Sequence, residues 1–131
     1  MSKYYTPEIE EFHVGFMFEE YTTFDEGTYR KRKIVGWRDR YFNNLTHDIR
    51  NKRVRVKYLD RKDIEELGWE YVGGKLIHGV LDNFHLGEYH LRYQYNNHHI
   101  IISDKDIKFA SFDGTCKNYN ELKRIMKQIG L

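Results

Sequence analysis

The chain has 131 residues, with 40% hydrophobic, 32% charged and 16% aromatic residues and a formal net charge of +2. A chain of this length buries roughly two-thirds of its unfolded surface, so we expect one domain over 1–131, with 1–11 loosely ordered. A single proline and a single cysteine exclude a proline-rich linker and an internal disulfide, and no apolar run approaches the ~20 residues that a membrane span needs.

Period-two alternation of apolar residues predicts most of the strands. The first begins at Phe12, where every second residue is apolar as far as Phe18. The most regular is 52–59, where apolar residues alternate with Arg53, Arg55 and Lys57. The predicted strands span 12–18, 29–37, 52–59, 69–72, 75–82, 88–95, 98–103 and 107–112. The segment 38–51 shows no such pattern, and one helical turn at 46–49 is the most that it indicates.

Turn and cap residues separate these strands. The predicted turns lie within 21–28 and at Gly73-Gly74, Asn96-Asn97 and Asp113-Gly114. Asp60 is expected to cap a short helix that ends at Gly68. Asn118 is expected to cap a C-terminal helix, whose apolar stripe consists of Leu122, Ile125, Met126 and Ile129. The predicted fold is α+β, a mostly antiparallel sheet of six to eight strands with both helices packed on it.

Positive charge is concentrated in one part of the chain. The window from Arg30 to Lys62 holds thirteen of the 22 basic residues and only three acids, so it carries +10 and the rest of the chain −8. Aromatic residues are interleaved with these cations, a combination that binds phosphates and stacks on bases. In the alternative interpretation, a hairpin places residues 30–33 opposite Glu19 and Glu20, and the cations form ion pairs on a solvated face.

Four segments, residues 10–16, 54–60, 63–69 and 117–131, resemble short proteins that phages and prophage-like elements of gut Bacteroidales encode. No activity is assigned to that group, so the resemblance transfers no catalytic or binding residue. What the resemblance implies is a biological setting, that of a small protein encoded by a phage or mobile element. Small phage proteins are often virion parts, host-takeover factors or counter-defence proteins.

Other chemistry has weaker support in the sequence. His85, His90, His98 and His99 lie near one another along the chain, but no metal-ligand spacing accompanies them, so no metal site is predicted. Cys116 precedes a helix N-terminus, where a thiol pKa can fall, but no histidine or acid is placed beside it by the sequence.

We therefore predict a cytoplasmic, non-enzymatic binding protein without a cofactor, which captures an anionic ligand in the host cell. A nucleotide signal of a host defence system is the most specific form of this prediction. The expected ligand-binding residues are Arg30, Arg32, Trp37, Arg38, Arg40, Tyr41, Arg53, Arg55 and Lys57. Nucleic acid, a host protein and a second copy of the chain are the other partners considered, and no membrane is expected.

Two alternatives belong to different classes of function. The first is a virion-associated or host-directed protein-interaction module. The second is a phosphodiester-cleaving enzyme in which His90, His98 and His99 are the first candidates for acid and base.

Overall fold

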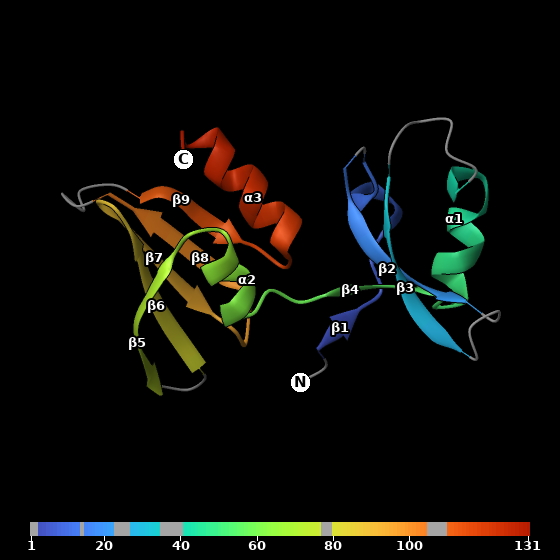
Figure 1. The fold of residues 1–131 in the computed structure, drawn as a ribbon, viewed down its shortest axis with the longest axis horizontal. Coiled ribbons are helices and arrows are strands. Elements are labelled where there is room, and N and C mark those ends of the chain that lie inside the picture. The colour runs from blue at the N-terminus through green and yellow to red at the C-terminus, as the bar shows by residue number, and fades with distance from the viewer. Residues whose placement is uncertain (1–2, 14, 23–26, 35–40, 77–79, 105–109) are drawn as a thin grey trace. The chain divides into compact units, whose positions relative to one another are not determined.

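A computed structural model describes residues 3–13, 15–22, 27–34, 41–76, 80–104 and 110–131, and it is α+β as predicted (Figure 1). The chain forms two compact units, Met1–Tyr58 and Leu59–Leu131. Each unit has its own hydrophobic core. The described residues form nine strands in two antiparallel sheets, rather than six to eight strands in one.

The first unit is a four-stranded sheet in the order β1-β4-β2-β3. Its elements are β1 (Tyr4–Tyr5), η1 (Ile9–Glu11), β2 (Met17–Thr22), β3 (Thr28–Lys33), α1 (Tyr41–Arg50) and β4 (Val54–Lys57). One face of the sheet carries the hydrophobic core of this unit. Its core consists of Phe12, Phe16, Phe18, Ile34, Val54 and Val56, with Tyr5 and Ile49 packed against them.

The alternation from Phe12 to Phe18 predicts correctly that Phe12, Phe16 and Phe18 are buried, but it does not predict where the strand begins; Val14 lies outside the described residues. Gly15 adopts a φ of +93° and its N–H donates to the carbonyl of Ile34, so the chain turns here and β2 begins only at Met17. Phe12 and Phe16 still reach the core, where the Phe12 ring lies edge-on to Phe16 at 5.0 Å and to Phe18 at 5.1 Å. Within 1–11, for which loose order is expected, the structure contains β1 and η1, and the segment 38–51 contains α1 rather than a single helical turn.

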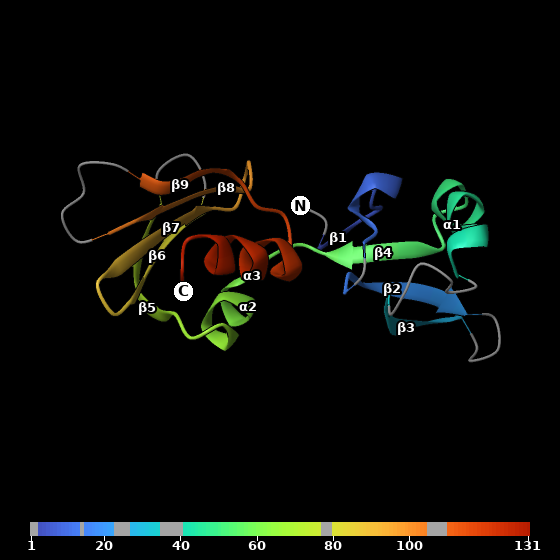
Figure 2. The same cartoon turned by 90° about the horizontal axis from the view of Figure 1, so that it is seen from above.

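The second unit is a five-stranded meander in the order β5-β6-β7-β8-β9. Its elements are α2 (Arg61–Glu66), β5 (Glu70–Leu76), β6 (Val80–Leu86), β7 (Tyr89–Gln94), β8 (His99–Ser103), β9 (Ala110–Thr115) and α3 (Tyr119–Gln128). Both helices lie on the same side of this sheet (Figure 2). The core between them and the sheet includes Trp69, Phe84, Leu91, Tyr93, Ile100, Ile102 and Leu122.

The hairpin around Asn96-Asn97 is confirmed, because β7 and β8 pair from His90↔Ser103 to Gln94↔His99. Two other predicted turns are wrong. Gly73-Gly74 lies inside β5, where a bulge after Tyr71 shifts the register, and Asp113-Gly114 lies inside β9. The strand predicted at 75–82 covers the end of β5 and the start of β6, and β9 extends beyond the predicted end of 107–112 to Thr115; residues 77–79 and 107–109 lie outside the described residues.

Both predicted helix caps are confirmed. The side chain of Asp60 accepts from the N–H of Asp63 at 2.9 Å, and that of Asn118 accepts from the N–H of Glu121 at 2.9 Å. In α3, Leu122, Ile125 and Met126 are buried and Ile129 packs against the same core, so the predicted stripe is the packed face. None of the helices in the described part of the chain has the length and apolar character that crossing a membrane requires.

Candidate functional site

Among the described residues, the predicted binding residues Arg30, Arg32, Arg55 and Lys57 lie in the four-stranded sheet, but not all on the same face. Directly paired residues share a face, and successive residues alternate. The register Glu20↔Arg30, Phe18↔Arg32 and Glu20↔Val54 puts Arg30 and Arg32 on the face that carries the core. The register Glu19↔Lys31, Glu19↔Arg55 and Tyr4↔Lys57 puts Arg55 and Lys57 on the opposite face. The sheet therefore does not bring the predicted binding residues together on one surface.

The face opposite the core, called here the basic face, carries Tyr4, Met17, Glu19, Tyr21, Tyr29, Lys31, Lys33, Arg55 and Lys57. Lys31 and Lys33 are exposed, and neither has an ion-pair partner among the described residues. With four cations and one carboxylate, the face has an excess of positive charge.

Arg55 is the centre of the basic face. Its guanidinium carbon lies 3.6 Å from the ring centroid of Tyr4 and 3.7 Å from that of Tyr29, so two aromatic rings flank the cation. Its Nη2 donates to Oε1 of Glu19 at 3.0 Å, and its Nε is buried without a hydrogen-bond partner in the described structure. Sequence reasoning missed Tyr4, because 1–11 offered no strand pattern.

The ion-paired interpretation of the basic window is also borne out in part. Arg30 and Lys31 do lie opposite Glu20 and Glu19, and Nε of Arg32 donates to Oε2 of Glu20 at 3.1 Å. Arg53 is exposed and lies just before β4. Trp37, Arg38 and Arg40 lie outside the described residues, and Tyr41 is described only as the first residue of α1.

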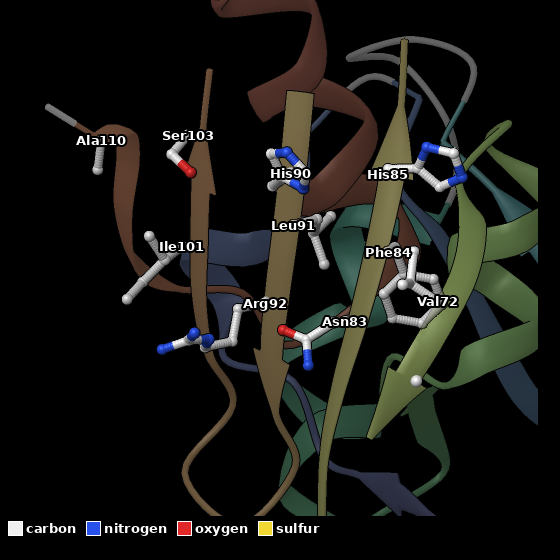
Figure 3. Close-up of a pocket in the computed structure, with 11 residues that line it drawn as sticks. Val72, Asn83, Phe84, His85, His90, Leu91, Arg92, Ile101, Ser103 and Ala110 are labelled. Carbon is white, nitrogen blue, oxygen red and sulfur yellow. The ribbon is translucent and has the colours of Figure 1, made fainter. Parts of the chain in front are cut away.

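The five-stranded sheet has a second face, on the side opposite α2 and α3, which no helix in the described part of the chain covers, and a hollow of about 750 Å³ lies over it (Figure 3). The side chains around the hollow alternate with core residues along three strands: Asn83 and His85 flank Phe84, His90 and Arg92 flank Leu91, and Ile101 and Ser103 flank Ile102. Sequence reasoning missed this surface because it ended the strand before β7 at Asp82. The polar–apolar–polar triplets at 83–85 and 90–92 were the available signal.

The histidines considered as acids or bases are not gathered in one place. His98 lies in the β7–β8 turn, with Nδ1 3.3 Å from the Tyr93 hydroxyl, and burial, assisted by Lys117, lowers its pKa. Nε2 of His99 lies 2.5 Å from Oδ1 of Asp113, whereas His90 faces the hollow. Among the described residues, no group of three or more His, Cys, Asp or Glu side chains is arranged to hold a metal ion.

Cys116 is buried, and this burial raises the pKa of its thiol well above the ordinary range, assisted by the nearby Glu121. The protonated form is therefore strongly favoured, and a thiol held in that form is a poor nucleophile.

No protein-family model, no curated protein and no solved structure matches the chain.

Proposed function

We propose that the protein is a non-enzymatic binding protein that captures a phosphate-bearing ligand, most specifically a nucleotide, on the basic face. One observation carries the proposal. The guanidinium of Arg55 stacks between Tyr4 and Tyr29, while Lys31 and Lys33 stand exposed on the same face without carboxylate partners among the described residues. Cations beside aromatic rings attract a phosphate and provide a surface for a base.

The buried Nε of Arg55 also supports a binding role. A buried donor without an acceptor costs about 1–3 kcal/mol, and such groups are rare in native structures unless they have a use. The resemblance to phage-encoded proteins supports the narrower form, in which the ligand is a nucleotide signal of host defence and the protein sequesters it in the host cytoplasm.

The test is a titration of mononucleotide, cyclic dinucleotide and short oligonucleotide probes over a range of salt concentrations. We expect affinity to fall as salt rises, because each cation–phosphate contact displaces counterions. The variant Lys31→Gln/Lys33→Gln should weaken binding and, for an oligonucleotide, flatten the slope of log K against log salt by about 1.4, at ~0.7 per lost contact.

The matched control is Lys123→Gln/Lys127→Gln, which removes two exposed lysines from α3 and should leave binding unchanged. Absence of binding by every probe at low salt would overturn the proposal and favour the protein-interaction alternative. Recovery of a chemically altered probe would favour the phosphodiesterase alternative.

A further inference from the structure

The hollow over the five-stranded sheet has the size and lining of a small-molecule site. Its volume, about 750 Å³, is within the ~300–1,000 Å³ typical of such sites. All of its lining residues belong to the second unit, and they come from each strand of the meander. It is therefore a different surface from the basic face, which belongs to the first unit.

Two rows of side chains cross the hollow. One runs through Asn83, Arg92 and Ile101, which are directly paired on β6, β7 and β8. The other runs through His85, His90 and Ser103, each two residues away from the member of the first row on the same strand. Neighbours in a row have Cβ atoms about 4.5–5.5 Å apart, so the polar groups fall within the span of one small ligand. Figure 3 shows both rows side by side over the sheet.

The charged groups of this face leave Arg92 without a carboxylate. The two acids that the described residues place on this face lie on the edge strands β5 and β9, and both are already engaged: Glu70 contacts Nε2 of His85 at 2.8 Å, and Asp113 contacts His99. The side chain of Arg92 is exposed and makes no ion pair or hydrogen bond among the described residues. Arg55 and Arg61, in contrast, both bind carboxylates.

The same holds for the polar side chains near it. Asn83, His90 and Ser103 all line the hollow, and none of their side chains has a hydrogen-bond partner in the described part of the chain. A guanidinium with several donors around it, and no acceptor of its own, is suited to a ligand that supplies negatively charged oxygens.

We propose that this hollow binds a small organic phosphate, with Arg92 holding the phosphate oxygens and Asn83, His90 and Ser103 donating to them. Apolar side chains complete the lining. Val72 is 63% exposed at one side of the hollow, and Ile101 lies beside Arg92 at the other. The hollow is far larger than a phosphate group, so the ligand carries an apolar or aromatic body that covers these side chains.

Titration of the full chain with three probes tests the proposal: phenyl phosphate, inorganic phosphate and neutral benzyl alcohol. Binding is followed by backbone amide NMR shifts, which locate the site. We expect phenyl phosphate to bind most tightly and to shift amides of β6, β7 and β8. Arg92→Gln should weaken it about tenfold or more, because charge-assisted hydrogen bonds to phosphate are lost, and Arg92→Lys should retain part of the affinity.

Ile101→Trp provides a second variant that keeps Arg92 and fills the hollow, and it should also abolish binding. Lys123→Gln on α3 is the control for charge and should have no effect. Equal binding of benzyl alcohol, unchanged affinity in Arg92→Gln, or shifts confined to the first unit would each overturn the proposal. Lys31→Gln/Lys33→Gln should not alter phenyl phosphate binding, so failure of this proposal and failure of the basic face are distinguishable.

Discussion

The side chain of Arg61 forms a two-point pair with Asp82, with Nε 3.1 Å from Oδ2 and Nη2 3.2 Å from Oδ1. Asp82 is only 2% exposed, so its carboxylate depends on partners within the protein. Tyr95 provides another, donating its hydroxyl to Oδ2 at 2.7 Å, while the Arg61 guanidinium lies 3.9 Å from the ring centroid of Tyr71. This network joins α2 to the middle of the five-stranded sheet.

Removing the Tyr95 hydroxyl should therefore destabilise the second unit. A hydrogen bond to a charged group contributes about 1.5–3 kcal/mol, so Tyr95→Phe should lower the free energy of unfolding by about that amount. Denaturant titration measures it. The control is Tyr89→Phe, because Tyr89 also packs against this core but its hydroxyl has no hydrogen-bond partner among the described residues. Equal losses in the two variants would show that the hydroxyl contributes nothing specific.

The same hydroxyl predicts a dependence on alkaline pH. Burial, and then the hydrogen bond to Asp82, raises the pKa of the Tyr95 phenol. Because the folded state favours the neutral phenol, this stabilisation is complete below the ordinary tyrosine pKa of about 10 and is lost as pH rises through the folded pKa. In a phenolate absorbance titration, one tyrosine should ionise only as the protein unfolds, and Tyr95→Phe should remove that late step. Its persistence in Tyr95→Phe would assign the step to another residue.

The sequence predicted local features better than those that depend on distant contacts. Asp60 and Asn118 cap helices by bonds to residues three positions away, and the α3 stripe follows from helical spacing, so each could be recognised locally. Gly73-Gly74 could not, because its place inside β5 depends on pairing with Asn83 and Asp82. Likewise, the start of β2 within the Phe12–Phe18 alternation depends on a turn in which the N–H of Gly15 donates to the carbonyl of Ile34, which is distant in sequence.

The candidate sites also depend on contacts between residues that are distant in sequence, so the sequence predicts them only in part. The sequence identified Arg55 among many cations, but the two rings that flank it come from β1 and β3, and only the sheet order brings them together. It also grouped Arg30 with Arg55, although alternation along paired strands puts them on opposite faces. The hollow could be predicted only from the pairing register of β6, β7 and β8. The turn wrongly predicted at Gly73-Gly74 shifts the predicted strand to 75–82, so the sequence does not indicate that register.

Cys116 should be inert toward thiol reagents while the chain is folded. Its side chain is buried and the raised thiol pKa suppresses the thiolate, so both access and reactivity are low. With a maleimide at neutral pH we expect no labelling of the native protein and rapid, stoichiometric labelling in denaturant, measured by mass. Fast labelling without denaturant would mean that the β9–α3 junction opens readily.

The two cores predict that the second unit folds without the first. Residues 59–131 contain every member of the core cluster around Trp69 and Leu91, together with the complete meander. We expect a fragment of these residues to show a cooperative thermal transition by circular dichroism, and the same fragment with Leu91→Asp to show none. An unfolded fragment would instead support the prediction of one domain over 1–131.

The packed face of α3 gives the final prediction. Leu122 is fully buried in the core of the second unit, and Ile125 is 7% exposed, whereas Lys123 lies on the outer face of the helix. Deleting a buried Leu or Ile side chain costs about 2–5 kcal/mol, a large part of the ~5–15 kcal/mol that stabilises a domain. Leu122→Ala and Ile125→Ala should therefore lower the melting temperature markedly, while Lys123→Ala should change it little. If all three variants melted together near the wild type, the helix would not be packed on the sheet. Its apolar stripe would then be exposed, and a surface of that kind would favour a protein partner over a small ligand.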